Sequence, residues 1–292
     1  MNDFLQRIEE SSLLLSDGAT GTYLQANGLE PGGCPELMNH THPDVVQNMA
    51  AQYFSAGSDM VETNSFGGSR YMLAKYNLGE RVVELNRKAA QLARSQAKPN
   101  QFVLGSIGPT GEMLEPSGTA TETEMYEVFC EQVRGLAEGG VDAICIETMS
   151  DLGETTLALR AAKDVAQVPV ITTMTFDKGP RGYFTMMGVT PASAAEQLSA
   201  AGADLVGTNC GLPIEGIIEI VAAMRNATDR PIVTHVNAGL PKIIKNEIVY
   251  PDLPKHMANL MAQVVEAGAN VVGGCCGTTP AHIRAFSEHL QK

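Results

Sequence analysis

The chain has 292 residues, of which 44% are hydrophobic, and its formal net charge is −13 at pH 7. This length and hydrophobic content suit one (β/α)8 barrel with a full core, whereas the acidic balance argues against a nucleic-acid partner. No apolar stretch reaches membrane-spanning length and the start does not read as a secretory signal, so we expect a cytoplasmic protein without a membrane partner.

Eight apolar runs of strand length alternate with longer amphipathic stretches along the whole chain. In chain order the predicted strands are residues 13–16, 60–63, 102–105, 143–146, 170–174, 205–208, 232–236 and 270–273. Parallel strands need a crossover between them, so this alternation predicts an α/β fold, a (β/α)8 TIM barrel formed by residues 1–292 as a single domain. The alternative is an open doubly wound sheet, but residues 17–22 lack the glycine spacing that would follow its first strand.

The segments between the runs have helical patterns. In residues 43–56, for example, Val45, Met49 and Tyr53 fall on one face, and Pro43 suits a first helical turn. Four junctions between a helix and the next strand share one form, with a glycine followed by Asp or Asn: residues 55–59, 138–142, 200–204 and 266–270. We expect a glycine in each to take a left-handed cap, as part of a repeated βα architecture.

In a parallel barrel, all strands end on one rim, where catalytic groups gather. Cys210 ends one apolar run, and Cys275 and Cys276 follow another between glycines, so three thiols are expected to converge on the rim. Three thiolates with a vacant fourth position make a Zn²⁺ site that can activate an incoming ligand.

Two other interpretations of these cysteines remain open. A lone Cys210 is most often a buried small hydrophobe, and the adjacent Cys275 and Cys276 could form a redox pair. Packing explains the adjacent pair poorly because consecutive strand residues point to opposite faces, and a bridge between neighbouring cysteines is strained. We therefore favour a metal site. The remaining cysteines lack a matching setting and are expected to be structural: Cys34, Cys130 and Cys145.

Carboxylates also follow the predicted strands. Asp17 and Glu147 are each either a satisfied buried carboxylate or a group that binds a cation, and Glu62 has the same placement. Burying such a group without a partner is costly, which favours a binding role. His235 is expected to be a core or supporting imidazole rather than a metal ligand.

Seven blocks of this sequence resemble the homocysteine S-methyltransferase family, in particular the homocysteine-binding barrel of cobalamin-dependent methionine synthase. The blocks are residues 17–22 (DGATGT), 62–67 (ETNSFG), 105–111 (GSIGPTG), 147–151 (ETMSD), 208–210 (TNC), 237–239 (NAG) and 273–278 (GGCCGT). They run in order through almost the whole chain, and the cysteine pattern is highly specific to the family.

The resemblance implies a zinc-dependent enzyme of EC class 2.1.1 that methylates the thiol of L-homocysteine to give methionine. It implies that zinc is held by Cys210, Cys275 and Cys276, which act catalytically through the metal. Two further groups of substrate-binding residues follow from it. Asp17 and Glu147 would receive the homocysteine ammonium, backbone N–H groups at Gly18 and Ala19 its carboxylate, and Asn237 would fill the fourth zinc position without substrate.

The methyl donor is the open part of this expectation. Cobalamin-dependent methionine synthases continue into folate, cobalamin and activation modules that have no counterpart in these 292 residues, so we expect the methyl group to come from elsewhere. We favour a methyl-corrinoid, such as methylcobalamin, carried on a separate protein that docks on the rim. The alternative is a small onium donor: S-methylmethionine, S-adenosylmethionine or a betaine. The betaine is least favoured, because a quaternary ammonium commonly needs an aromatic cage and the chain has no Trp.

A non-enzymatic alternative is a zinc-dependent subunit that binds or senses thiols without turnover. Every ligand and carboxylate position of the family pattern is filled, which favours the enzyme.

Overall fold

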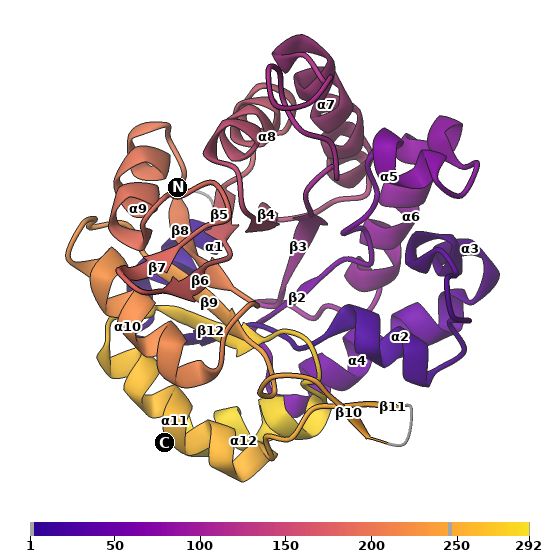
Figure 1. Ribbon diagram of the computed structural model, residues 1–292. Helices are drawn as coiled ribbons and strands as arrows, with labels where there is room; N and C mark the ends of the chain where they lie inside the picture. Colours follow the sequence, from indigo (N-terminus) through magenta and orange to yellow (C-terminus); the bar gives the residue numbers. More distant parts are fainter. Residues whose placement is uncertain (1–2, 245–246, 292) are drawn as a thin grey trace.

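The computed structural model describes residues 3–244 and 247–291 and has the predicted barrel at its centre. Eight parallel strands form one sheet in the order β1-β12-β9-β8-β5-β4-β3-β2 (Figure 1). They are β1 (Leu14–Leu15), β2 (Met60–Glu62), β3 (Phe102–Ile107), β4 (Ala143–Met149), β5 (Val170–Met174), β8 (Leu205–Asn209), β9 (Ile232–Val236) and β12 (Val271–Gly274). Each of the eight predicted strands is therefore confirmed, and the (β/α)8 prediction with them.

Helices surround the sheet, as Figure 1 shows. The α-helices are α1 (Asp3–Glu10), α2 (Thr20–Ala26), α3 (Met38–Thr41), α4 (Pro43–Ala56), α5 (Arg70–Ala74), α6 (Val82–Arg94), α7 (Glu122–Glu138), α8 (Leu152–Val165), α9 (Pro191–Ala200), α10 (Ile214–Arg225), α11 (Pro254–Glu266) and α12 (Pro280–Leu290). Two short 3₁₀ turns, η1 (Pro35–Leu37) and η2 (Gly79–Arg81), complete the set. Helix α4 has the predicted bounds, and it buries Met49, Tyr53 and Phe54. No helix of the described chain combines the length and the apolar character needed to cross a bilayer.

The repeated junctions of glycine with Asp or Asn have a clear structural role. Their glycines at positions 57, 140, 202 and 268 all have positive φ, between 86° and 115°, as expected for left-handed caps. The Asp or Asn that follows accepts a hydrogen bond from the first residues of the neighbouring strand. Asp142 accepts from Val103 N at 2.7 Å, for instance, and Asn270 accepts from Ile232 N at 2.9 Å. Asp59 and Asp204 do the same for β1 and β5.

The barrel interior is layered. Its lower part is an apolar cluster that includes Leu14, Met60 and Val233, and helix α1 closes it from below with the buried side chains of Phe4 and Ile8. Side chains two residues further along each strand point to the same side. At that next level, towards the strand ends, the interior becomes polar, and the site described below begins there.

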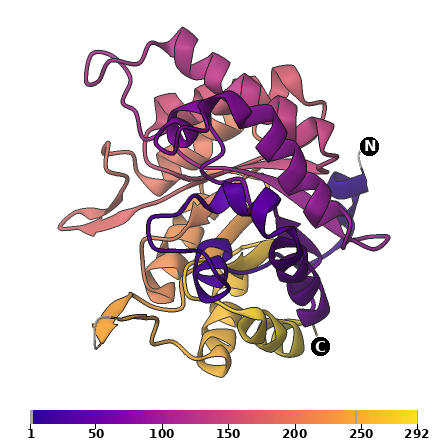
Figure 2. The ribbon, with the colours of Figure 1, turned by 90° about the vertical axis from the view of Figure 1, so that its right-hand side faces the viewer.

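Two antiparallel hairpins extend the loops at the same end of the barrel. They are β6 (Asp177–Gly179) with β7 (Gly182–Phe184), and β10 (Lys242–Ile244) with β11 (Glu247–Val249). Figure 2 shows both projecting from one side of the molecule, opposite to the two chain ends. That side carries the C-terminal ends of the strands, so the hairpins flank the rim.

Candidate metal and amino-acid site

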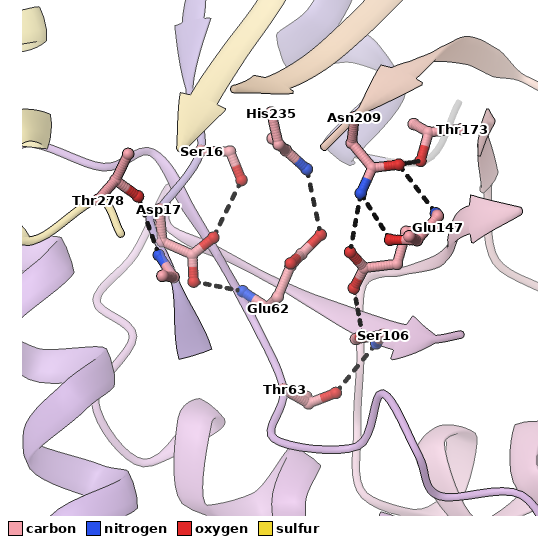
Figure 3. Close-up of polar contacts among 12 residues, drawn as sticks. Ser16, Asp17, Glu62, Thr63, Ser106, Glu147, Thr173, Asn209, His235 and Thr278 are labelled. Atoms are coloured by element: carbon pink, nitrogen blue, oxygen red, sulfur yellow. Dashed lines mark hydrogen bonds and ion pairs between the residues drawn. The ribbon is translucent and has the colours of Figure 1, made fainter. Parts of the chain in front are cut away.

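A ring of buried polar side chains forms the upper layer of the barrel interior (Figure 3). It consists of Ser16, Glu62, Ser106, Glu147, Thr173, Asn209 and His235. Each comes from a different strand or strand end, and most are joined by hydrogen bonds. The three predicted cysteines lie next to this ring.

The structure brings the three thiols together. Cys210 follows β8, whereas Cys275 and Cys276 follow β12, and their sulfur atoms all lie within 4.8 Å of one another. Strand β9 lies between these strands and holds both segments. The backbone N–H of Cys210 donates to His235 O at 3.0 Å, and that of Cys275 donates to Val236 O at 2.7 Å. The predicted convergence of the thiols is thus a property of the fold.

Glycines and a threonine allow two adjacent cysteines to face the same point. The Thr278 N–H and hydroxyl both donate to Cys275 O, at 3.1 and 2.7 Å, which closes a tight turn. A Cβ on Gly274 would lie 2.1 Å from the Thr278 hydroxyl oxygen. Gly277 has φ of +79°, and a Cβ there would overlap the ring of Tyr250. Both glycines are therefore required by the turn.

The three thiols are hydrogen-bonded to one another, and no Lys or Arg of the described residues contributes to their pKa. Hydrogen bonds from Cys275 and Cys276 lower the pKa of the Cys210 thiol to about 2, while the hydrogen bond to Cys210 raises the pKa of Cys276 to about 11. The Asn237 side chain also bonds to Cys210, yet its Oδ1 is buried and has no partner within the described chain. Three soft sulfur donors beside a free oxygen fit the ligand preference of Zn²⁺.

Two predicted carboxylates, Glu147 in the ring and Asp17 beside it, are buried without a basic partner among the described residues. Asp17 Oδ2 accepts from Glu62 N at 2.9 Å, and its Oδ1 accepts from the Ser16 hydroxyl at 3.2 Å. Glu147 Oε1 accepts from the Ser106 hydroxyl. Burial raises the pKa of Asp17 and that of Glu147 to about 7 each. Such carboxyls gain most from a ligand that brings a positive charge.

Asn209 joins the sulfur side of the site to the carboxylate side. Its Nδ2 donates to Thr148 Oγ1 at 2.7 Å and to Glu147 Oε2 at 3.4 Å, and its Oδ1 accepts from Thr148 N at 2.8 Å. Both Thr148 and the adjacent Cys210 have φ near +60°, a conformation that residues other than glycine rarely adopt. Asn209 thus holds Thr148, a residue of β4 with strained backbone, next to Cys210, the strained residue that follows β8.

A cavity of about 350 Å³ opens over these groups. Of the predicted residues, its lining includes Gly18, Ala19, Glu147, Cys210, Cys275 and Cys276, but not Asp17 or Asn237. The Ala19 N–H already donates to the Thr278 hydroxyl at 3.1 Å, so a ligand carboxylate there would have to share this donor. No Lys or Arg of the described residues lines the cavity.

Sequence reasoning did not single out Asn209 or Thr278 as functional. Both belong to blocks that carried the family resemblance, and the available signal was a polar side chain close in sequence to a predicted thiol ligand: Asn209 directly precedes Cys210, and Thr278 lies two residues after Cys276. Their roles depend on contacts between segments, which sequence order does not show.

The comparisons with known proteins agree with this geometry. The family model described as homocysteine S-methyltransferase matches residues 14–290. The methionine synthase of Mycobacterium tuberculosis is 34% identical over 298 aligned residues, and that of Mycobacterium leprae is 31% identical over 302. These alignments cover 93% and 97% of this chain but only 24% of each relative. The chain therefore spans about a quarter of the length of these relatives.

Solved structures support the fold. The metallated form of the homocysteine methyltransferase MmuM from Escherichia coli superposes with a TM-score of 0.82 at 21% identity, covering 98% of this chain and 99% of that one. The carboxyl transferase domain of pyruvate carboxylase from Rhizobium etli gives 0.58 at 17% identity, covering 99% and 48%. At these identities the likeness concerns the barrel alone. Because the family model covers nearly the whole chain, the chain belongs to the homocysteine S-methyltransferase family, a family of methyltransferase enzymes.

Proposed function

We propose that this protein transfers a methyl group to the thiol of L-homocysteine, giving methionine, at a zinc ion held by Cys210, Cys275 and Cys276. The observation that carries the proposal is the convergence of these three sulfurs, which lie within 4.8 Å of one another. They line a cavity that is also lined by the carboxylate of Glu147. When bound, Zn²⁺ would supply the acidity that keeps the substrate thiol deprotonated and nucleophilic.

The chain's own residues bind and orient the substrate. Asp17 and Glu147 provide negative charge for the ammonium group, and the segment at Gly18 and Ala19 provides backbone N–H groups for the carboxylate. Without substrate, the free Oδ1 of Asn237 is the candidate for the fourth metal position. In the transfer, a bond forms from the substrate sulfur to the methyl carbon as the bond from donor to carbon breaks, and the electron pair leaves with the donor. The residues need only position the reactants and exclude competing nucleophiles.

The donor we propose is a methyl-corrinoid carried on a separate protein. The sequence resembles methionine synthases over almost its whole length. A cavity of about 350 Å³ suits one amino acid, so a corrin ring would meet the sulfur at its mouth.

The distribution of exposed apolar side chains also supports a macromolecular donor. In the described chain, every exposed large hydrophobic residue lies in a loop that follows β2, β3, β5 or β9, on the rim that surrounds the cavity. They are Phe66, Tyr76, Met113, Met186, Met187, Leu240, Ile243, Ile248, Val249 and Leu253. Exposed apolar side chains that gather on one face are typical of a surface that contacts another protein.

Methionine formation from homocysteine, assayed in parallel with methylcobalamin, S-methylmethionine, S-adenosylmethionine and betaine, tests the proposal. We expect turnover with methylcobalamin. Turnover with an onium compound alone would replace the proposed donor, and homocysteine binding without turnover on any donor would indicate a binding subunit.

Matched cysteine variants show whether the three thiols carry the activity. Cys276→Ala should remove most bound zinc and abolish turnover while the barrel stays folded, because the core does not depend on a metal at the rim. Cys130→Ala, which removes a thiol outside the cluster, should keep both. Equal zinc content in the two variants would contradict the ligand assignment.

A further inference from the structure

Glu62, at the end of β2, differs from the other carboxylates of the ring. Its Oε1 is fully buried and has no hydrogen-bond partner in the described chain. Oε1 lies 3.5 Å from His235 Nδ1, a long separation for a hydrogen bond. The Glu62 carboxyl also neighbours Glu147 and Cys145, neither of which is a cation. A buried carboxylate oxygen without a partner is costly, so its presence at a cavity calls for a ligand.

The cavity places this oxygen where a ligand can reach it. Glu62 and Glu147 both line the cavity, whereas Asp17 does not. Figure 3 shows Glu62 between Asp17 on one side and Glu147 on the other. Both Asp17 oxygens are already engaged, and one of them holds the Glu62 backbone N–H at 2.9 Å. In addition to the negative charge that it provides, Asp17 therefore positions Glu62, the residue that carries the free oxygen.

The surroundings of Glu62 offer no counter-charge. His235 is only 3% exposed and its Nε2 also has no partner, while burial lowers its pKa to about 4, so the imidazole is neutral. Burial and the nearby Glu147 raise the pKa of Glu62 well above its ordinary value. A cationic group that enters the cavity would meet two carboxylates, one from β2 and one from β4, and no Lys or Arg among the described lining residues.

We infer that Glu62 is a substrate-binding carboxylate that receives the homocysteine ammonium together with Glu147, an assignment that rests on the proposed function. An ammonium group has three N–H donors and no acceptor, so a single carboxylate leaves it only partly satisfied. The free Oε1 of Glu62 supplies a second carboxylate acceptor beside Glu147. Glu62 therefore makes the site selective for amino-acid thiols over thiols without an amine.

The test compares two ligands by isothermal titration of the zinc-loaded protein: homocysteine and 4-mercaptobutyrate, which lacks the amine. Glu62→Gln should weaken homocysteine binding by about 10- to 100-fold, the effect of losing one charge-assisted hydrogen bond. It should leave 4-mercaptobutyrate binding unchanged or slightly tighter. Glu62→Asp, which keeps the charge, should fall between the parent and the Gln variant for homocysteine.

Glu36→Gln is the matched control. Glu36 is another buried carboxyl on the same cavity, but its oxygens accept from Gly67 N at 2.7 Å and from the Cys34 thiol at 3.3 Å. Its substitution should change the affinity for both ligands by the same factor. An equal change for both ligands in Glu62→Gln, or no change for homocysteine, would overturn the role of Glu62 alone. A parent protein that does not bind homocysteine would overturn the proposed function and this inference with it.

Discussion

At the scale of single residues, the main feature of the rim is a group of buried carboxyls, with no Lys or Arg of the described residues lining the cavity beside them. Burial raises the pKa of Asp17, Glu62 and Glu147, and the nearby Glu147 adds to this effect on Asp17 and Glu62. Without a cationic ligand, folding therefore favours the protonated form of these carboxyls. Burying these carboxyls without a cation lowers the stability of the ligand-free protein. A cationic substrate that pairs with them removes this cost, and the gain adds to the free energy of binding.

Asp17 should make stability depend on pH in an unusual direction. Burial raises its pKa from 3.8 to about 7, so the folded protein keeps a proton that the unfolded chain releases between about pH 4 and 7. The free energy of unfolding without substrate should therefore fall as pH rises through this window and level off above pH 7. For a shift of this size the change is on the order of a few kcal/mol.

Urea unfolding of the parent and Asp17→Asn across this pH range measures that contribution. The Asn side chain does not titrate, so the parent should lose stability relative to the variant as pH rises from about 4 to 7. Parallel curves for the two proteins would show that Asp17 does not titrate in this window.

Sequence reasoning located these residues but not their contacts. A strand that ends in Asp or Glu predicts a carboxyl on the rim, which holds for Asp17, Glu62 and Glu147 alike. Which carboxyl has a free oxygen depends on partners such as Ser16 and Ser106, whose side chains reach across strands. These partners become neighbours of the carboxyls only when the strands pair in register, so the sequence alone does not show which oxygen remains free.

At the scale of elements, hydrophobic patterning predicted the barrel strands closely. The predicted ranges 170–174 and 232–236 match β5 and β9. Strand β4 runs three residues past its predicted end, to Met149, because Met149 pairs with Met174 of β5 after a register shift that spans Glu147 and Thr148. The hairpins β6–β7 and β10–β11 were not predicted, since strands of three residues are too short to show a period-2 hydrophobic pattern.

The Asp of the repeated junctions should contribute measurably to stability. Asp142→Ala removes the acceptor of the Val103 N–H and the ion pair with Arg94, so we expect a loss of about 1–3 kcal/mol in the free energy of unfolding. Asp142→Asn is the matched variant, because Asn270 fills the equivalent position before β12 with an amide oxygen.

Urea denaturation should place Asp142→Asn close to the parent, because the ion pair is partly exposed and contributes little. Equal losses in the Asn and Ala variants would show that the charge, and not the hydrogen bond to Val103, stabilises the junction.

At the scale of the whole molecule, the fold separates stability from chemistry. The lower part of the barrel and the surrounding helices form the apolar core. The polar ring, the thiols and the exposed apolar side chains all lie at the end of the barrel where the parallel strands terminate. Figure 2 shows that the hairpins extend this same end, away from the chain termini. Alternating strands and helices were enough to predict that the thiols share one rim, but not the cavity, whose shape depends on loops after several strands.

X-ray absorption at the zinc edge tests most directly whether the three thiols hold a metal that accepts the substrate sulfur. Without substrate, we predict three sulfur neighbours at about 2.3 Å and one lighter atom. Saturating homocysteine should convert this shell to four sulfurs, and selenohomocysteine should add one selenium neighbour. A shell that keeps three sulfurs and no selenium at saturation, or a protein that binds no zinc, would contradict it.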